Sequence, residues 1–174
     1  MKPKFIEYYM DIAILTSKLS YAKRLQVGAV IVKNNQVIGT GYNGMPSGWD
    51  NNCENIELID LSDEQLDPKE LLQLYPFEGK FWINYVEVDT RYRLKTKQEV
   101  LHAESNAIAK VSRSTESSEN ATLFCTHAPC IECAKLIYQS GISNIYYRDA
   151  YRDNTGLDFL RKSGVNVTNH KPQG

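Results

Sequence analysis

The sequence has no excess of charge of either sign, no long apolar run and no set of cysteines spaced like a disulfide framework. Over 174 residues the formal net charge is −1, whereas proteins that bind nucleic acid through its phosphates usually carry a basic excess. No stretch approaches the roughly 18 apolar residues of a membrane-spanning helix. The N-terminus also lacks the apolar core of a signal peptide. These absences predict a cytoplasmic protein of one domain, with neither nucleic acid nor membrane as partner.

The four cysteines favour a metal site over disulfides. Cys130 and Cys133 form a Cys-x-x-Cys pair, while Cys53 and Cys125 are isolated. A four-cysteine structural zinc site would need a second close pair, which the sequence lacks. A redox dithiol stays open as an alternative, although such pairs usually open the first helix of a thioredoxin-like domain. Few and unpaired thiols fit a reducing compartment.

A histidine and a glutamate upstream complete a catalytic metal pattern with this pair. One imidazole, from His102, and two thiolates, from Cys130 and Cys133, supply three ligands to Zn²⁺ and leave one tetrahedral position open for water. Glu104 is not needed as a ligand and is therefore free to move protons. H-x-E followed by P-C-x-x-C is the known signature of zinc-dependent nucleobase deaminases. We therefore predict metal ligands His102, Cys130 and Cys133 and a catalytic Glu104.

Less specific interpretations of the same residues remain. His102 alone could be a core histidine, and a fourth ligand could close the site. His127 is the nearest candidate for that ligand, and His170 is a more distant one. A closed site would make the chain a zinc-binding module without catalysis. Cys125 lies in an apolar segment, so we interpret it as a small buried side chain.

Apolar periodicity predicts four helices and five strands around one long interruption. The expected helices cover 4–22, 103–111, 129–140 and 156–163. The expected strands cover 27–32, 37–42, 121–126, 142–147 and 165–167, with a tight turn at 34–35. This order predicts an α/β fold of three α/β/α layers, with a mixed central sheet of about five strands flanked by helices. Pro129 would open its helix, so Cys130 and Cys133 would lie in its first turn, where the helix dipole favours thiolates.

The interruption is too long for a bare loop in a compact domain. We expect a single domain over 1–174 with an insertion at about 44–99. The first half of the insertion, 54–75, is acidic, and its segment 62–65 fits a capping box that would start a helix. The second half, 81–97, is aromatic and net basic. A lid, a regulatory site and a subunit contact remain alternatives for its role.

Several motifs resemble those of the deoxycytidylate deaminases in the cytidine deaminase superfamily. They are QVGAVIV at 26–32, GYNGMPSG at 41–48, HAESNAI at 102–108, APCIECAK at 128–135 and QSGI at 139–142. The resemblance covers 5–53 and 100–168, and the insertion matches only loosely. It implies a cytidine-deaminase-like fold and zinc-dependent hydrolysis of dCMP to dUMP with release of ammonia. The alternative is another zinc deaminase, acting on free cytidine or deoxycytidine or on a tRNA or single-strand base.

The resemblance also implies roles for residues near the metal. The backbone N–H of Ala103 would bind the pyrimidine O2, and Asn43 would hold the deoxyribose 3′-hydroxyl. Arg24, just before the first strand, is our candidate for binding the phosphate. The alternative is that Arg24 is a solvated basic residue at the end of the first helix. Tyr151 would wall the base or phosphate, with a plain surface tyrosine as the alternative.

Regulation and assembly are likewise implied by the resemblance. It predicts a homohexamer that dCTP activates and dTTP inhibits, each triphosphate arriving with Mg²⁺. The loop after Asn43 would contact the effector, and its candidate residues are Gly44, Met45 and Asp50.

A second metal is not expected. Some viral members of the family hold a structural zinc through a cysteine near position 19 or 20 and a histidine in the insertion. This chain has Leu19 and Ser20 at those places, and 45–100 contains no histidine. We therefore predict one catalytic zinc per chain.

Overall fold

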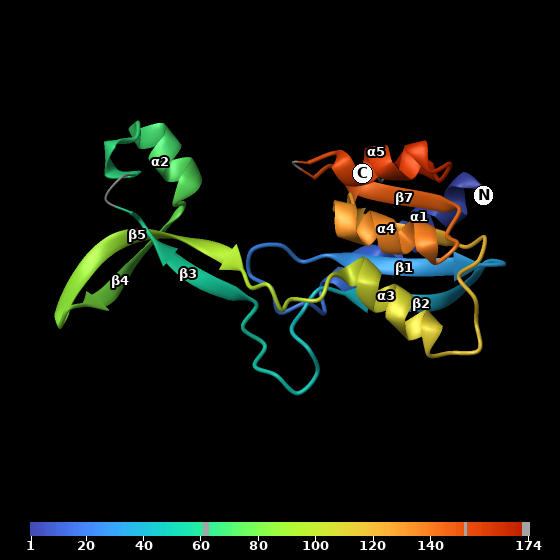
Figure 1. Cartoon of the computed structure of the whole chain (residues 1–174), viewed down its shortest axis with the longest axis horizontal. Helices are drawn as coiled ribbons and strands as arrows, with labels where there is room; N and C mark the ends of the chain where they lie inside the picture. Colours follow the sequence, from blue (N-terminus) through green and yellow to red (C-terminus); the bar gives the residue numbers. More distant parts are fainter. Residues whose placement is uncertain (61–62, 152, 172–174) are drawn as a thin grey trace. The chain divides into compact units, whose positions relative to one another are not determined.

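The structure, a computed structural model, describes residues 1–60, 63–151 and 153–171 (Figure 1). The chain packs into two compact units. The main unit consists of Met1–Asn52 and Glu99–Gly174, and the insertion unit is Cys53–Gln98. In the part of the chain described, no helix combines the length and apolar character needed to cross a membrane.

The main unit is built on a five-stranded mixed sheet in the order β2-β1-β6-β7-β8. Its strands are β1 (Gly28–Lys33), β2 (Gln36–Tyr42), β6 (Thr122–His127), β7 (Asn144–Asp149) and β8 (Asn166–Asn169). β1 pairs antiparallel with β2 and β6, whereas β6, β7 and β8 run parallel. The predicted mixed sheet is thus confirmed.

Helices cover both faces of this sheet. α1 (Pro3–Ser17) packs on one face, where Tyr9, Met10 and Ala13 meet Val30 and Phe124. The other face carries α3 (Ala103–Ser112), α4 (Ile131–Gln139) and α5 (Thr155–Lys162). Because the central strands bury both faces, they consist of continuous apolar runs. The three-layer α/β/α prediction is confirmed.

The first helix is shorter than the sequence predicted. It ends at Ser17, so the expected helix over 4–22 is wrong at its C-terminal end. The Ser20 hydroxyl donates a hydrogen bond to the carbonyl of Asn43 (2.7 Å) and accepts one from the N–H of Ala22 (3.1 Å). These side-chain bonds compete with helical backbone bonds and direct the chain toward the end of β2.

Two links fix the hairpin that leads to the insertion. Asn34 and Asn35 both have positive φ values, 50° and 61°, which is the geometry of a type I′ turn and confirms the predicted tight turn. Just beyond β2, Gly44 and Leu101 form an isolated antiparallel bridge, with N–H to carbonyl distances of 3.1 and 2.9 Å. The segment 45–100, which contains the insertion unit, therefore starts and ends next to two main-unit residues that are bonded to each other.

The insertion unit is a three-stranded antiparallel sheet in the order β3-β5-β4 (Figure 1). Its elements are β3 (Glu54–Leu58), a 3₁₀ turn η1 (Asp63–Gln65), α2 (Pro68–Leu74), β4 (Phe77–Ile83) and β5 (Val86–Thr96). Ser62, the first residue of the predicted capping box, lies outside the described residues. The helix instead starts at Pro68, with Asp67 as its N-cap, whose side chain accepts from the N–H of Lys69 at 2.8 Å.

The strand register divides this sheet into two chemically different faces. One face, the apolar face, consists of large apolar side chains. Its members are Ile56, Leu58, Phe77, Phe81, Ile83, Val86, Val88, Tyr92 and Leu94. The opposite, charged face holds cross-strand ion pairs, namely Arg91–Glu78, Arg93–Glu57, Lys95–Glu57 and Lys80–Glu87. Such alternation is typical of an antiparallel sheet with one solvated face.

Candidate metal centre

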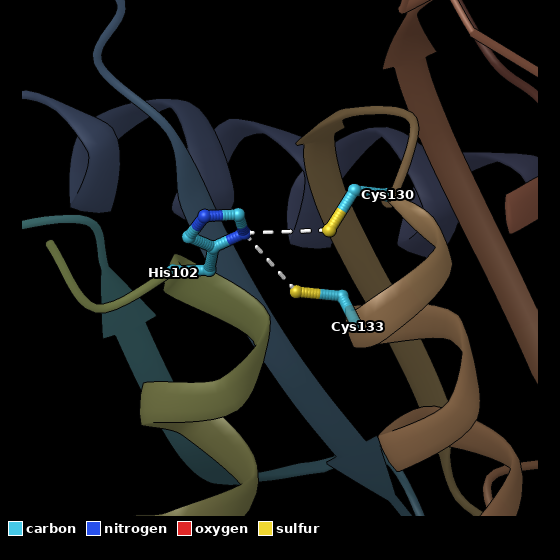
Figure 2. Close-up of side chains that lie close together, drawn as sticks. All are labelled: His102, Cys130 and Cys133. Atoms are coloured by element: carbon cyan, nitrogen blue, oxygen red, sulfur yellow. Dashed lines mark hydrogen bonds between the residues drawn. The ribbon is translucent and has the colours of Figure 1, made fainter. Parts of the chain in front are cut away.

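Three side chains from two helix N-termini meet beside the end of β6. His102 is the N-cap residue of α3, Cys130 is the N-cap residue of α4, and Cys133 lies in the first turn of α4. His102 Nδ1 is 3.5 Å from Cys130 Sγ and 3.4 Å from Cys133 Sγ (Figure 2). α4 begins at Ile131 and not at Pro129, which corrects the expected helix start by two residues. The three predicted ligands are nevertheless neighbours.

Their spacing fits a tetrahedral zinc ion. With Zn–N and Zn–S bonds of about 2.0 and 2.3 Å, ligand atoms at the tetrahedral angle lie about 3.5 Å apart. Within the described residues, His102, Cys130 and Cys133 are the one group whose ligand atoms all lie within 4.8 Å of one another. No fourth His, Cys, Asp or Glu ligand joins the group among the residues that the structure describes, which matches a catalytic and not a closed structural site. His102 is exposed and Cys133 is buried, so the group opens toward solvent on the histidine side.

The two thiols differ sharply in acidity. The pKa of Cys130 is lowered to about 3, because its thiolate accepts hydrogen bonds from the Cys133 thiol and from His102. The same hydrogen bond, together with burial, raises the pKa of Cys133. The thiolate of Cys130 in turn raises the pKa of His102. A cation bound here would displace the protons of these hydrogen bonds, since thiolates and neutral imidazole are the forms of Cys and His that bind metals.

Glu104 lies beside the group but is not part of it. Its residue is only 4% exposed, and burial raises the pKa of its carboxyl. Hydrogen bonds from its own backbone N–H and from the Cys133 thiol oppose that rise. A buried carboxyl with a raised pKa next to a metal site is suited to both accept and release protons.

Both helix N-termini point their partial positive charge at this group. Neither His102 nor Cys130 uses its side chain to cap the first backbone N–H groups of its helix. The N-terminal N–H groups of α3 and α4 therefore keep their polarity toward the ligands. This field favours the thiolate of Cys130, in line with the prediction from its helical position. Cys133 differs, because its hydrogen bond to Cys130 and its burial raise its pKa.

The geometry agrees with a recognised family. A family model described as the cytidine and deoxycytidylate deaminase zinc-binding region matches residues 3–149, which is most of the chain. The chain belongs to this deaminase family. The zinc-binding character of the family and the His102/Cys130/Cys133 group together support Zn²⁺ as the metal.

Relatives extend the agreement over nearly the whole chain. The chain is 36% identical to the deoxycytidylate deaminase of Enterobacteria phage T2, over 92% of this chain and 89% of the relative. The chain is 34% identical to the deoxycytidylate deaminase of Enterobacteria phage T4, over 92% of this chain and 86% of the relative. A crystal structure of dCMP deaminase from the cyanophage S-TIM5, in complex with dCMP and dUMP, matches with a TM-score of 0.73 and 37% identity, covering 98% of this chain and 99% of that chain. The predicted cytidine-deaminase-like fold is confirmed.

Asn43 is held in place by the backbone of the segment before β1. Its Oδ1 accepts a hydrogen bond from the N–H of Val27, and its Nδ2 donates one to the carbonyl of Leu25, both at 2.8 Å. The side chain is buried at the end of β2. A primary amide has two N–H donors and two acceptor lone pairs, so these two bonds use half of its capacity. Its contact with a sugar hydroxyl stays a prediction of the family resemblance.

The remaining predicted substrate residues lie on different elements. Ala103 is the first residue of α3 and is fully buried, and a backbone N–H at this helix position has no carbonyl partner within its own helix. Arg24 is exposed in the loop before β1. Tyr151 follows β7 and packs half-buried against the main core. The roles of these residues stay predictions.

The predicted effector residues follow β2. Gly44 pairs with Leu101 in the bridge described above, and Met45 beside it is half-buried. Asp50 is exposed, and its carboxylate accepts a hydrogen bond from the N–H of Asn52 at 3.2 Å. Their contact with a nucleotide also stays a prediction.

His127, the nearest alternative ligand, is engaged elsewhere. Its Nδ1 lies 3.1 Å from Thr126 Oγ1, and its Nε2 lies 3.7 Å from the carboxylate of Asp149. Burial lowers its pKa. Neither His127 nor His170 belongs to the ligand group found in the described chain. Cys125 is fully buried in β6, as expected, and burial raises its pKa.

Two glycines bring the ligand segments close to their supports, through packing contacts that the sequence did not predict. A Cβ on Gly41 would lie 2.1 Å from the carbonyl oxygen of Ala103, and one on Gly156 would lie 2.2 Å from the carbonyl oxygen of Pro129. Gly41 thus places β2 against the first turn of α3. Gly156 places the start of α5 against the segment that carries Cys130. A glycine inside a strand pattern such as Gly41 signals close backbone approach, so this one could have been found.

The close contact at Gly156 predicts a stability effect. Gly156→Ala should lower the free energy of unfolding by about 1–3 kcal/mol, because the added methyl overpacks a backbone contact. It should also weaken zinc binding by displacing Cys130. Urea unfolding and chelator competition measure the two effects. Gly44→Ala is the control, because its Cβ would meet only Tyr42, at an ordinary 3.9 Å. Equal unfolding free energies in the two variants would contradict the role of Gly156.

Proposed function

We propose that the chain catalyses the hydrolytic deamination of dCMP to dUMP, with release of ammonia. The observation that carries the proposal is the open His102/Cys130/Cys133 group with the buried carboxyl of Glu104 beside it. The similarity to dCMP deaminases over nearly the full chain supports the choice of substrate. Free and reduced thiols at positions 130 and 133 fit a cytoplasmic enzyme.

His102, Cys130 and Cys133 would hold one Zn²⁺ per chain. When bound there, zinc supplies the Lewis acidity that lowers the pKa of a water ligand from about 15.7 toward 7. The chain's own contribution is to keep Cys130 ionised, to hold Cys133 where a bound cation would displace its proton, and to place an acid–base group next to the reacting water.

Glu104 is that group. It takes a proton from the attacking water, whose oxygen bonds to C4 of the cytosine, and it delivers this proton to N3. A second proton, from the new C4 hydroxyl, passes through the same carboxyl to the amino nitrogen. The C4–N4 bond then breaks, ammonia leaves, and C4 becomes the carbonyl of uracil. One buried carboxyl thus serves first as base and then as acid.

Four residues would orient the nucleotide. The Ala103 N–H donates to the pyrimidine O2, and Asn43 uses its remaining amide capacity on the 3′-hydroxyl of the sugar. Arg24 pairs with the 5′-phosphate by a charge-assisted hydrogen bond. Tyr151 lines the pocket beside the base or the phosphate.

We also propose a homo-oligomer, a hexamer by family resemblance, that dCTP–Mg²⁺ activates and dTTP–Mg²⁺ inhibits. The effector would contact Gly44, Met45 and Asp50. The bridge between Gly44 and Leu101 supports this coupling, because Leu101 directly precedes His102. An effector can shift the active state only through its different affinity for the two states.

A deamination assay on a substrate panel tests the proposed activity. We expect kcat/KM for dCMP to exceed that for deoxycytidine at least about tenfold, because a hydrogen bond to a charged group contributes roughly 1.5–3 kcal/mol. Turnover of cytidine or deoxycytidine at the same efficiency would assign the chain to the nucleoside deaminases. No turnover by zinc-loaded protein would reject catalysis altogether.

The same assay tests regulation. We expect sigmoidal dependence of rate on dCMP, which becomes hyperbolic with dCTP–Mg²⁺ and is depressed by dTTP–Mg²⁺. Hyperbolic kinetics that neither triphosphate changes, in protein shown to be oligomeric, would leave dCMP deamination intact and reject the regulatory proposal.

A further inference from the structure

The segment between α1 and β1 is basic and contains neither helix nor strand. It consists of residues 18–27, named the basic loop, and it includes Lys18, Lys23 and Arg24 but no acidic residue. All three cations are exposed. Because such a loop lacks the repeated backbone bonds of a helix or a sheet, other contacts must offset the entropic cost of holding one conformation. The position of its cations therefore depends on the groups that bind its two ends.

Asn43 binds the end of the basic loop that leads into β1. Its side-chain amide is bonded to the N–H of Val27 and the carbonyl of Leu25, as described above, and its backbone N–H donates to the carbonyl of Val27 at 3.2 Å. Asn43 is only 8% exposed, so water has little access to these groups. The end of the loop is thus fixed to the residue that is proposed to hold the sugar.

Ser20 ties the beginning of the loop to the same asparagine. Its hydroxyl donates a hydrogen bond to the backbone carbonyl of Asn43 at 2.7 Å and accepts one from the N–H of Ala22 at 3.1 Å. The residue is only 5% exposed. Across the loop, the side-chain Nε2 of Gln26 donates to the carbonyl of Ser20 at 2.7 Å. The loop is therefore closed at Ser20, and Lys23 and Arg24 lie within the closed part.

The substrate proposed above differs from a nucleoside only by its phosphate. A charge-assisted hydrogen bond to a phosphate requires the cation at a short, defined distance. A cation on a mobile loop must first be ordered, and the entropic cost of this ordering lowers the affinity. Bonds that fix the loop before the nucleotide binds therefore favour the phosphorylated substrate over the nucleoside.

We propose that Ser20 is a positioning residue that holds the basic loop against Asn43 and thereby sets the preference of the site for a phosphorylated nucleotide. The proposal rests on the dCMP deaminase activity proposed above. A hydroxyl has a single donor, and the donor of Ser20 is committed to the Asn43 carbonyl. Ser20 consequently acts on the nucleotide through the position of Lys23 and Arg24.

Two substitutions in the full-length, zinc-loaded protein each remove one bond that closes the loop. Ser20→Ala removes the bond to Asn43, and Gln26→Met removes the bond to the Ser20 carbonyl. Ser17→Ala is the matched control. Ser17 is a buried serine three residues earlier, 8% exposed, whose hydroxyl donates only to a carbonyl of its own helix, that of Ile14 at 2.8 Å.

The rate of tryptic cleavage after Lys23 and Arg24 in the native protein measures opening of the loop, because a protease cuts transiently opened segments. Cleavage after Lys135, inside α4, is the reference for unfolding of the main unit. We expect Ser20→Ala to speed cleavage of the loop at least about tenfold relative to Lys135, because buried polar groups lose a partner. Gln26→Met should act in the same direction but less strongly, since Gln26 is exposed. Ser17→Ala should leave both rates unchanged.

Steady-state kinetics with dCMP and deoxycytidine measure the effect on the substrate. We expect Ser20→Ala to raise KM for dCMP at least about threefold, because affinity falls with the fraction of molecules in the binding-competent conformation. An unchanged kcat would show that binding and not chemistry is affected. The value of kcat/KM for deoxycytidine, which has no phosphate, should stay at the wild-type level.

Three results would overturn the proposal. They are wild-type cleavage of the loop in both variants, faster cleavage with an unchanged KM for dCMP, and an equal loss of kcat/KM for dCMP and deoxycytidine. If zinc-loaded wild-type protein turns over neither compound, the proposed function fails. The dissociation constants of dCMP and deoxycytidine, measured by calorimetry on the same variants, then decide the role of Ser20 by the same criteria.

Discussion

Glu104→Gln is expected to abolish nearly all dCMP deamination while zinc content and unfolding free energy stay close to wild type. The substitution keeps the shape of the side chain but removes its ability to accept a proton. Loss of general acid–base catalysis costs about 10²–10⁴-fold in rate. Because one carboxyl moves both protons in the proposed mechanism, we expect the upper part of that range. Steady-state kinetics at saturating dCMP, with elemental analysis of zinc, measure the effect.

Glu132→Gln is the matched control for this experiment. Glu132 holds the same position in the first turn of α4 that Glu104 holds in α3. Its side chain is 74% exposed and pairs with Lys135 at 2.8 Å, on the solvent side. We expect wild-type kcat from it. A Glu104→Gln enzyme with full zinc and near-wild-type turnover would disprove the assigned role.

Cys133→Ala and Cys130→Ala are expected to lose zinc and stability together. Removing one of three protein ligands should weaken zinc by more than the 10–100-fold seen for second-shell partners. Zinc binding contributes to folding free energy, so the melting temperature should fall as well. Elemental analysis after dialysis against a chelator, with thermal unfolding, measures both effects. Wild-type protein should retain one zinc per chain in the same dialysis.

Cys125→Ala separates ligand loss from the loss of a buried thiol. Cys125 is fully buried but lies outside the ligand group. We expect this variant to be less stable because of the small cavity it creates, yet to keep its zinc. Full zinc occupancy in Cys130→Ala or Cys133→Ala, or two tightly held zinc ions in wild type, would refute the assignment of ligands.

The metal centre could be predicted from sequence because its information is local. Each half of the pattern, His102 with Glu104 and Cys130 with Cys133, spans less than two helical turns, so the spacing alone constrains the geometry. The start of α4 at Ile131, two residues later than predicted, does not affect this spacing. The hairpin turn at Asn34 was equally predictable, since asparagine tolerates positive φ.

The strands of the insertion unit were not predicted, although their alternation is present. Phe77, Phe81 and Ile83 point to one face, and charged residues separate most of them. Trp82 interrupts the alternation of apolar and charged residues, because it is a large apolar residue that lies on the charged face. Asn84 with a positive φ of 50° marks the hairpin turn that was overlooked.

The end of α1 and the support of the metal ligands depend on tertiary contacts, which no local pattern carries. The Ser20 hydroxyl donates a hydrogen bond to the carbonyl of Asn43, which lies 23 residues further along the chain, and Ser20 is therefore not part of the helix. Gly156 matters only because the backbone of Pro129 lies against it. Asn43 was chosen by resemblance for a ligand, yet the structure shows that it also ties its strand to Leu25 and Val27.

The bridge between Gly44 and Leu101 makes the insertion modular. The entropic cost of closing a flexible loop grows only with the logarithm of its length, and here the two ends of the loop are already hydrogen-bonded. A segment of any length attached at these residues disturbs the deaminase unit little, much as domains inserted at adjacent surface ends are tolerated. The segment between Gly44 and Leu101 can therefore be lengthened, shortened or replaced without a change in the zinc site.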